Sequence, residues 1–184
     1  MTVVVRETRE TTVRVELKGG AGTATVDTGM PFLDHMLTTL ARYAGLDLVV
    51  HARGDLRHHI VEDVALSLGA AFAAALPPTA ARYGDRTVPM DDALVHVALD
   101  VGGRAYYAGP IPGTLYEHWM RSFSDSARAT LHIRVLRGRD RHHIVEAAFK
   151  ALGLALRDAL IETGGVFSTK GSVVLQVDPE GAPC

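Results

Sequence analysis

The stretch RHHIVEDVALSLG, Arg57–Gly69, begins with an arginine and two adjacent histidines. A glutamate follows three residues after the second histidine, and the remaining residues are mostly apolar. The chain repeats it downstream as RHHIVEAAFKALG, Arg141–Gly153. In the first copy Val61, Ala65 and Leu68 recur at intervals of three and four, which is typical of a helix with one buried face. Because the same helix start occurs twice, we expect a fold built from two equivalent halves.

Each copy is preceded by the same order of expected elements. The first half has strands over Thr12–Leu17 and Thr23–Thr28, a helix over Pro31–Gly45, a strand over Leu46–Ala52 and a helix over His58–Leu76. The second half has strands over Ala93–Asp100 and Arg104–Gly109, a helix over Thr114–Ala129, a strand over Thr130–Leu136 and a helix over Arg141–Glu162. The periodicities and the bounding Pro and Gly residues support these assignments. Additional strands are expected over Val3–Arg6 and Ser172–Val177.

The pattern predicts an α+β fold, a tandem repeat of two β-β-α-β-α halves that form a two-layer α/β sandwich with helices on one face of mixed or antiparallel sheets. We interpret KGGAG, residues 18–22, as a hairpin turn between the first two strands. Pro77–Asp92, rich in proline and turn formers, reads as the junction. We place the first half at residues 1–88 and the second at 89–184, together forming one integrated unit.

The composition excludes several classes of protein. Of 184 residues 47% are hydrophobic and 22% charged, and the net charge of −2 comes with no basic block, which argues against nucleic-acid binding. No apolar run reaches the ~20 residues of a membrane span, and the N-terminus lacks the apolar core of a signal peptide. The single cysteine, Cys184, excludes an intrachain disulfide. We therefore expect a cytoplasmic protein with no membrane partner.

The nine histidines are the unusual feature. On a helix Glu62 shares a face with His58 and with His59, while the two histidines point about 100° apart, an arrangement that suits two neighbouring metal ions. His142, His143 and Glu146 repeat this geometry, and each half carries one earlier helical histidine. The candidate metal ligands are His35, His58, His59, Glu62, His118, His142, His143 and Glu146.

Divided by symmetry, eight ligands make two sites of four. Imidazole and carboxylate without thiolate favour Mn, Fe, Co or Zn over Ca, and the ligand number favours octahedral Mn(II) or Fe(II). The histidines must be neutral to bind, so the affinity should fall on acidification. One HHxxE pattern alone is often just a solvated helix face; its repetition favours the metal interpretation. His51, His96 and His132 lack a carboxylate at ligand spacing and are interpreted as structural.

Anion-binding candidates are less specific. Phe167–Ser172, FSTKGS, combines hydroxyls, a lysine and a glycine in one turn, which can cradle a phosphate; taken alone, the motif is more often an ordinary surface turn. Arg104, after VGG, and Arg82, in ARYGD, are of types that are more often solvated surface charges than ligands. Lys150 follows Glu146 by one helical turn, so the simplest interpretation is an ion pair between them.

Six motifs follow one another along the chain: RETRET (6–11), DTGMPFLDHM (27–36), HHIVEDVALSLG, PMDDALVHVALDVGGR (89–104), HHIVEAAFKALGLAL and STKG (168–171). In this order they resemble the motifs of the imidazoleglycerol-phosphate dehydratase family, and the resemblance covers essentially the whole chain. The resemblance implies halves with the fold of ribosomal protein S5 domain 2. It further implies two Mn(II) ions per active site, no organic cofactor, active sites between subunits and a homo-oligomer of twenty-four chains.

The resemblance also implies roles for individual residues. It places the metal ligands on the same eight residues, and the phosphate contacts on Arg82, Arg104, Ser168 and Lys170. It assigns the acid–base function to Glu10 and an active-site function to Lys150. Without the resemblance, Glu10 reads as one more exposed strand carboxylate.

The implied reaction is a lyase step of histidine biosynthesis, the dehydration of D-erythro-imidazoleglycerol phosphate to imidazoleacetol phosphate. Two metal ions on the ring nitrogens would stabilise an imidazolate, whose electrons expel the adjacent hydroxyl to give a diazafulvene. Loss of the acidified C–H proton gives an enol that tautomerises to the ketone. Glu10 would move the protons, and the phosphate would add binding energy.

Two departures from the family pattern bear on activity. The loop before the first histidine pair is shortened to Leu56–Arg57, and Thr39 stands where the family commonly has glutamine. Neither removes a ligand. The alternatives are a divergent metal-binding homologue with reduced or altered activity, and a dinuclear metallohydrolase on the same scaffold. Glu10 and the phosphate set favour the lyase.

Overall fold

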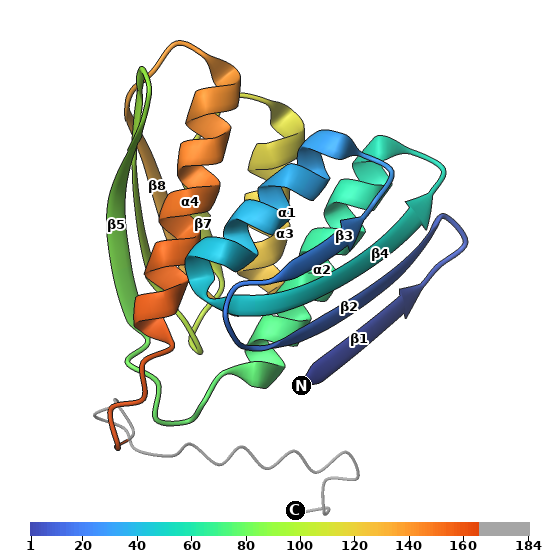
Figure 1. The fold of residues 1–184 in the computed structure, drawn as a ribbon, viewed down its shortest axis with the longest axis horizontal. Coiled ribbons are helices and arrows are strands. Elements are labelled where there is room, and N and C mark those ends of the chain that lie inside the picture. Colours follow the sequence, from blue (N-terminus) through green and yellow to red (C-terminus); the bar gives the residue numbers. More distant parts are fainter. Residues whose placement is uncertain (166–184) are drawn as a thin grey trace, which may run out of the picture.

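The structure is a computed structural model that describes residues 1–165; the expected strand Ser172–Val177 lies outside them. The first half contains β1 (Thr2–Glu7), β2 (Thr11–Gly19), β3 (Ala24–Asp27), α1 (Pro31–Ala44), β4 (Leu46–Gly54) and α2 (Arg57–Ala75). The second contains β5 (Tyr83–Met90), β6 (Ala93–Asp100), β7 (Tyr106–Ala108), α3 (Thr114–Ser126), β8 (Thr130–Arg137) and α4 (Arg141–Ala159). The repeated β-β-α-β-α order and the α+β class are confirmed (Figure 1).

Each half begins with one further strand. β1 fulfils the expectation for Val3–Arg6, whereas β5 lies within Pro77–Asp92, so the interpretation of that whole stretch as a junction is wrong. β5 is an edge strand, where its Pro89 is tolerated, and this explains its weak strand signal. The boundary expected after residue 88 falls inside β5, and we propose to divide the halves before Tyr83.

The sheets are mixed, with strand orders β1-β2-β4-β3 and β5-β6-β8-β7. β3 and β7 run parallel to their neighbours β4 and β8, and the other pairs are antiparallel. The predicted hairpin across residues 18–22 is therefore wrong, because β4 lies between β2 and β3. The alternate residues Leu48, Val50 and Ala52 of β4 are buried, as expected for a strand in a sheet with one covered face.

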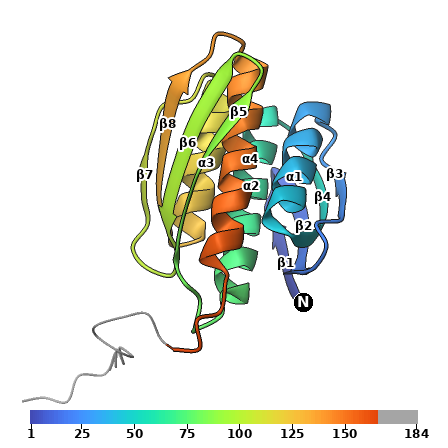
Figure 2. The ribbon, with the colours of Figure 1, turned by 60° about the vertical axis from the view of Figure 1, so that its left-hand side comes forward.

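The four helices lie between the two sheets, so each half is a two-layer sandwich and the halves join through their helices (Figure 2). α1 packs against α4 and α2 against α3, each pair combining one helix from either half. Among residues 1–165, no helix has the length and hydropathy that crossing a bilayer requires. This helix pairing brings the two repeat copies into one structure.

A glycine allows the close approach in each helix pair. A Cβ added at Gly69 of α2 would lie 2.8 Å from the Phe123 carbonyl oxygen of α3. The corresponding Cβ at Gly153 of α4 would lie 2.9 Å from the Leu40 carbonyl oxygen of α1. Both distances are shorter than a carbon normally tolerates, so the final glycine of each repeat copy is a packing requirement.

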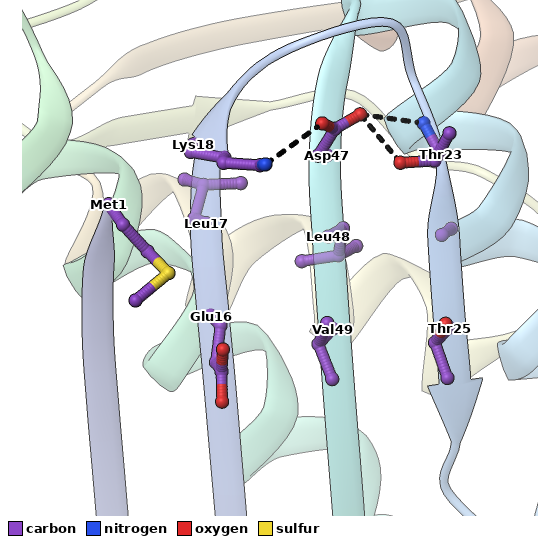
Figure 3. A pocket seen from close by; sticks show the side chains of 10 residues that line it. Met1, Glu16, Leu17, Lys18, Thr23, Thr25, Asp47, Leu48 and Val49 are labelled. Atoms are coloured by element: carbon purple, nitrogen blue, oxygen red, sulfur yellow. Dashed lines mark hydrogen bonds and ion pairs between the residues drawn. The ribbon is translucent and has the colours of Figure 1, made fainter.

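A shallow hollow of about 280 Å³ lies over β2, β3 and β4, and no candidate site residue lines it (Figure 3). At its rim the Asp47 carboxylate accepts hydrogen bonds from the Thr23 hydroxyl at 2.7 Å and the Thr23 backbone N–H at 2.9 Å. The Lys18 Nζ lies 3.5 Å away. The hydrogen bond from the Thr23 hydroxyl, followed by that from its N–H, lowers the pKa of Asp47 to about 2.

Asp47→Asn is expected to lower the melting temperature at pH 6 and to leave it nearly unchanged at pH 2. A carboxyl group with a folded-state pKa below its ordinary 3.8 stabilises the fold above that pH, and the contribution disappears as the pH falls through about 2. Thermal melts of both proteins between pH 2 and 6 test this. A constant difference in melting temperature across the range would contradict it.

Candidate metal centre

Two groups of side chains have the composition and spacing of metal sites. In the first, the α1–α4 cluster, His35 of α1 meets His142 and Glu146 of α4. The Glu146 Oε2 lies 3.0 Å from His142 Nε2 and 3.4 Å from His35 Nε2. The cluster therefore takes ligands from both halves, through the α1–α4 packing.

The second group, the α2–α3 cluster, is its repeat counterpart. His58 and Glu62 of α2 meet His118 of α3. The Glu62 Oε2 lies 3.3 Å from His118 Nε2 and 3.7 Å from His58 Nε2. The rings of His58 and His118 stack with centroids 4.6 Å apart.

The donor sets fit a metal ion. In each cluster three ligand atoms lie within 4.8 Å of one another, two imidazole nitrogens and one carboxylate oxygen. His118 Nε2 is buried and makes no hydrogen bond, an arrangement that is costly unless another partner is supplied. A divalent cation would supply it, and this donor type suits first-row transition metals. His51, His96 and His132 belong to neither group.

Glu146 is the buried carboxylate of the site. Its side chain is 8% exposed, and Lys150 Nζ lies 3.0 Å from Oε1. Burial raises the pKa of Glu146, but the hydrogen bond and charge of Lys150, together with His35, outweigh it, so the pKa lies below the ordinary value. Lys150 thus makes the ion pair that its spacing predicts, and it favours the ionised form of a candidate ligand carboxylate.

His59 does not join the α2–α3 cluster. Its Nδ1 lies 2.8 Å from Asp55 Oδ1 and 3.6 Å from Glu10 Oε2. The hydrogen bond to Asp55 raises the pKa of His59, and the same bond lowers the pKa of Asp55. Glu10 therefore lies beside His59, one of the predicted ligands.

His143 likewise stands apart from the α1–α4 cluster. Its Nδ1 lies 2.7 Å from Asp92 Oδ1, and its Nε2 lies 3.3 Å from Asp91 Oδ2. The hydrogen bond to Asp92 raises the pKa of His143, and that bond is the largest cause of the lowering of the pKa of Asp92 to about 2. The structure thus gathers six of the eight predicted ligands into two clusters of three. His59 and His143 belong to neither cluster.

The turn that carries Glu10 is held from both sides. The Thr8 hydroxyl accepts hydrogen bonds from the N–H groups of Glu10 at 3.1 Å and Thr11 at 2.9 Å. The buried Asp63 of α2 accepts one from Arg6 Nε at 2.8 Å and another from the Thr11 hydroxyl. Glu10 is therefore positioned by the helix that carries His59.

Arg82, one of the predicted phosphate residues, lies far from the clusters. The Arg82 N–H donates to the carbonyl oxygen of Ala159, the last residue of α4, at 3.0 Å. His142 lies in the first turn of the same helix. At ~1.5 Å per residue, His142 and the Ala159 end of the helix are about 25 Å apart along its axis. The Arg82 carbonyl accepts from the Val101 N–H, which places Arg82 beside the loop that leads to Arg104. Ser168 and Lys170 lie outside the described residues.

The two helices that carry the histidine pairs begin differently. Leu56 precedes α2 and provides no side-chain cap, whereas Asp140 before α4 accepts a hydrogen bond from the His142 N–H at 2.8 Å. Thr39, one turn after His35, is 7% exposed and lies in the core. The sequence prediction missed Asp55 and Asp92. Asp55 lies four residues before His59 in the chain, which is a local signal, whereas Asp92 lies 51 residues before His143 and had none.

Comparisons with known proteins agree with these observations. The sequence profile described as imidazoleglycerol-phosphate dehydratase matches residues 28–156. The imidazoleglycerol-phosphate dehydratase of Acidothermus cellulolyticus is 49% identical over 92% of this chain and 91% of its own. That of Pyrobaculum calidifontis is 50% identical over 90% of this chain and 96% of its own.

Solved structures give the same result. The dehydratase from Pyrococcus furiosus has a TM-score of 0.83 and 41% identity, covering 92% of this chain and 100% of that one. The Staphylococcus aureus enzyme has a TM-score of 0.79 and 31% identity, covering 88% and 99%. With the paired His and Glu clusters, these matches show that the chain belongs to the imidazoleglycerol-phosphate dehydratase family, metal-dependent lyases of histidine biosynthesis that act on a phosphorylated imidazole.

Proposed function

We propose that this chain dehydrates D-erythro-imidazoleglycerol phosphate to imidazoleacetol phosphate with two Mn(II) ions in each active site. The observation that supports this proposal is the pair of His and Glu clusters, equivalent by the repeat and each built from both halves. Imidazole and carboxylate donors suit Mn(II), with Fe, Co and Zn as alternatives. The two clusters would hold the ions, with His59 and His143 completing the ligand set.

The side chains then have separate tasks. The bound ions supply Lewis-acid stabilisation of negative charge on the substrate's imidazole ring. Glu10 transfers the protons, since a carboxylate next to the site can both donate and accept one during elimination. Lys150 keeps Glu146 ionised, and Arg82, Arg104, Ser168 and Lys170 bind the phosphate. The dehydration would pass through the diazafulvene that the family resemblance implies.

We further propose that each active site forms between subunits of a twenty-four-chain homo-oligomer. Within one chain, the Arg82 N–H contacts the last residue of α4, which lies about 25 Å from His142 along the helix axis, farther than a substrate of this size extends. His59 and His143 belong to neither cluster, bind aspartates instead and are partly exposed. Both observations are accounted for if neighbouring chains supply the missing ligands and the phosphate contacts.

Mixing two inactive variants tests the shared site. Arg104→Ala and Glu146→Gln are each expected to be inactive, whereas particles co-assembled from both should regain activity. If one chain supplies the metal cluster and another the phosphate contacts, about a quarter of the sites in a random equal mixture are intact. Activity that stays at the level of the separate variants would contradict a site shared between chains.

The reaction itself is tested by incubating the Mn(II)-loaded protein with imidazoleglycerol phosphate and following ketone formation. We expect stoichiometric imidazoleacetol phosphate with no release of inorganic phosphate. Phosphate release without ketone would instead support a metallohydrolase. Metal binding with neither product would identify a divergent homologue that has lost turnover.

A further inference from the structure

The second histidine of each pair is held through Nδ1 by an aspartate from a turn. Asp55 lies 2.8 Å from Nδ1 of His59, and Asp92 lies 2.7 Å from Nδ1 of His143. Neither aspartate is among the predicted ligands or the acid–base and phosphate residues. The recurrence of one hydrogen bond in both halves indicates a shared function.

The two aspartates reach that position by different routes. Asp92 directly precedes β6, and Glu10 directly precedes β2, so these two carboxylates occupy equivalent places in the repeat. In the first half the hydrogen bond to the histidine is made by Asp55, in the shortened loop before α2. In the second half it is made by Asp92. Glu10 consequently remains 3.6 Å from His59, and within residues 1–165 its carboxylate accepts no hydrogen bond. In the first half, therefore, Asp55 and not Glu10 makes the hydrogen bond to the histidine.

Both aspartates are themselves fixed by backbone groups. Asp92 Oδ2 accepts hydrogen bonds from the N–H groups of Arg139 at 2.6 Å and Asp140 at 3.2 Å. Asp55 Oδ1 accepts one from the Leu56 N–H at 2.7 Å. Each carboxylate is thus held by the start of the helix whose histidine it contacts, so ring orientation follows helix orientation.

The chemistry of this contact is specific. An ionised carboxylate can only accept, so Nδ1 must carry the proton and Nε2 is the nitrogen left to bind a metal. We propose that Asp55 and Asp92 are positioning residues that set the tautomer and ring orientation of His59 and His143 for metal binding. The inference rests on the proposed metal-dependent function. Asp91, 3.3 Å from His143 Nε2, lies on the side where the ion would bind.

Manganese affinity, measured by calorimetry on the assembled protein, tests this proposal. Asp55→Ala and Asp92→Ala should each weaken binding at the affected site by about 10- to 100-fold. Asp55→Asn and Asp92→Asn should recover most of the affinity, because the amide oxygen still accepts the Nδ1 proton. The matched control is Asp85→Ala, which removes an exposed carboxylate from β5 and should leave affinity unchanged.

Two outcomes would overturn the proposal. Unchanged affinity in both alanine variants would show that the hydrogen bonds do not orient ligands. Equal losses in the alanine and asparagine variants would show that charge, and not hydrogen bonding, is responsible. Affinity is measured separately from turnover, so wild-type protein that binds Mn(II) but forms no ketone would contradict the proposed function without affecting this test.

Discussion

Glu10→Gln is expected to lower kcat by roughly 10²- to 10⁴-fold, the usual contribution of a general acid–base group. The amide keeps the size of the side chain but cannot exchange a proton. The Glu10 carboxylate lies 3.6 Å from His59 Nδ1, and the turn is fixed by Thr8 and Asp63. The substitution should therefore leave metal content and particle size unchanged.

Steady-state kinetics with a metal assay on the same samples measures this effect. Glu7→Gln is the matched control, because Glu7 is an exposed residue at the end of β1 and the chemical change is identical. The control should retain wild-type kcat. Wild-type turnover in Glu10→Gln would show that another group moves the protons.

Gly153→Val is expected to destabilise the fold and to remove metal from the α1–α4 cluster. The new side chain would meet the Leu40 carbonyl oxygen at 2.9 Å and Tyr43 Cβ at 2.8 Å, both in α1. Overpacking of this kind typically costs about 1–3 kcal/mol. Because α1 carries His35 and α4 carries His142 and Glu146, forcing these helices apart should separate the ligands.

Chemical denaturation and metal content test this prediction together. The α2–α3 cluster should keep its metal, so the metal content should fall by about half. Gly19→Val serves as control, because a Cβ at Gly19 meets nothing within 4 Å. Full metal content in a destabilised Gly153→Val protein would show that the cluster does not depend on this helix contact.

The sequence predicted the helices well because their signals are local. Apolar periodicity, proline starts and glycine ends lie within each segment, and the repeat supplied a second copy of each signal. Strand order depends on pairing between distant segments, so the hairpin expected across residues 18–22 was wrong. β5 was missed because an edge strand with Gly84 and Pro89 shows little strand pattern.

In the candidate site, too, local features could be predicted from the sequence and contacts between distant segments could not. The identity of the metal-ligand candidates followed from spacing on single helices. Their grouping did not, because it depends on α1 meeting α4 and α2 meeting α3 across the halves. Asp92 contacts His143 from a turn 51 residues earlier in the chain, and local spacing cannot reveal such a contact.

The central claim is that metal bound by the His and Glu clusters supports dehydration. The most direct measurement is a titration of metal-stripped protein with Mn(II), following metal content, particle mass and ketone formation on the same sample. The account predicts inactive, smaller particles without metal, and ketone formation that rises in proportion to bound Mn(II). Full dehydration by metal-free protein, or none at Mn(II) saturation, would contradict it.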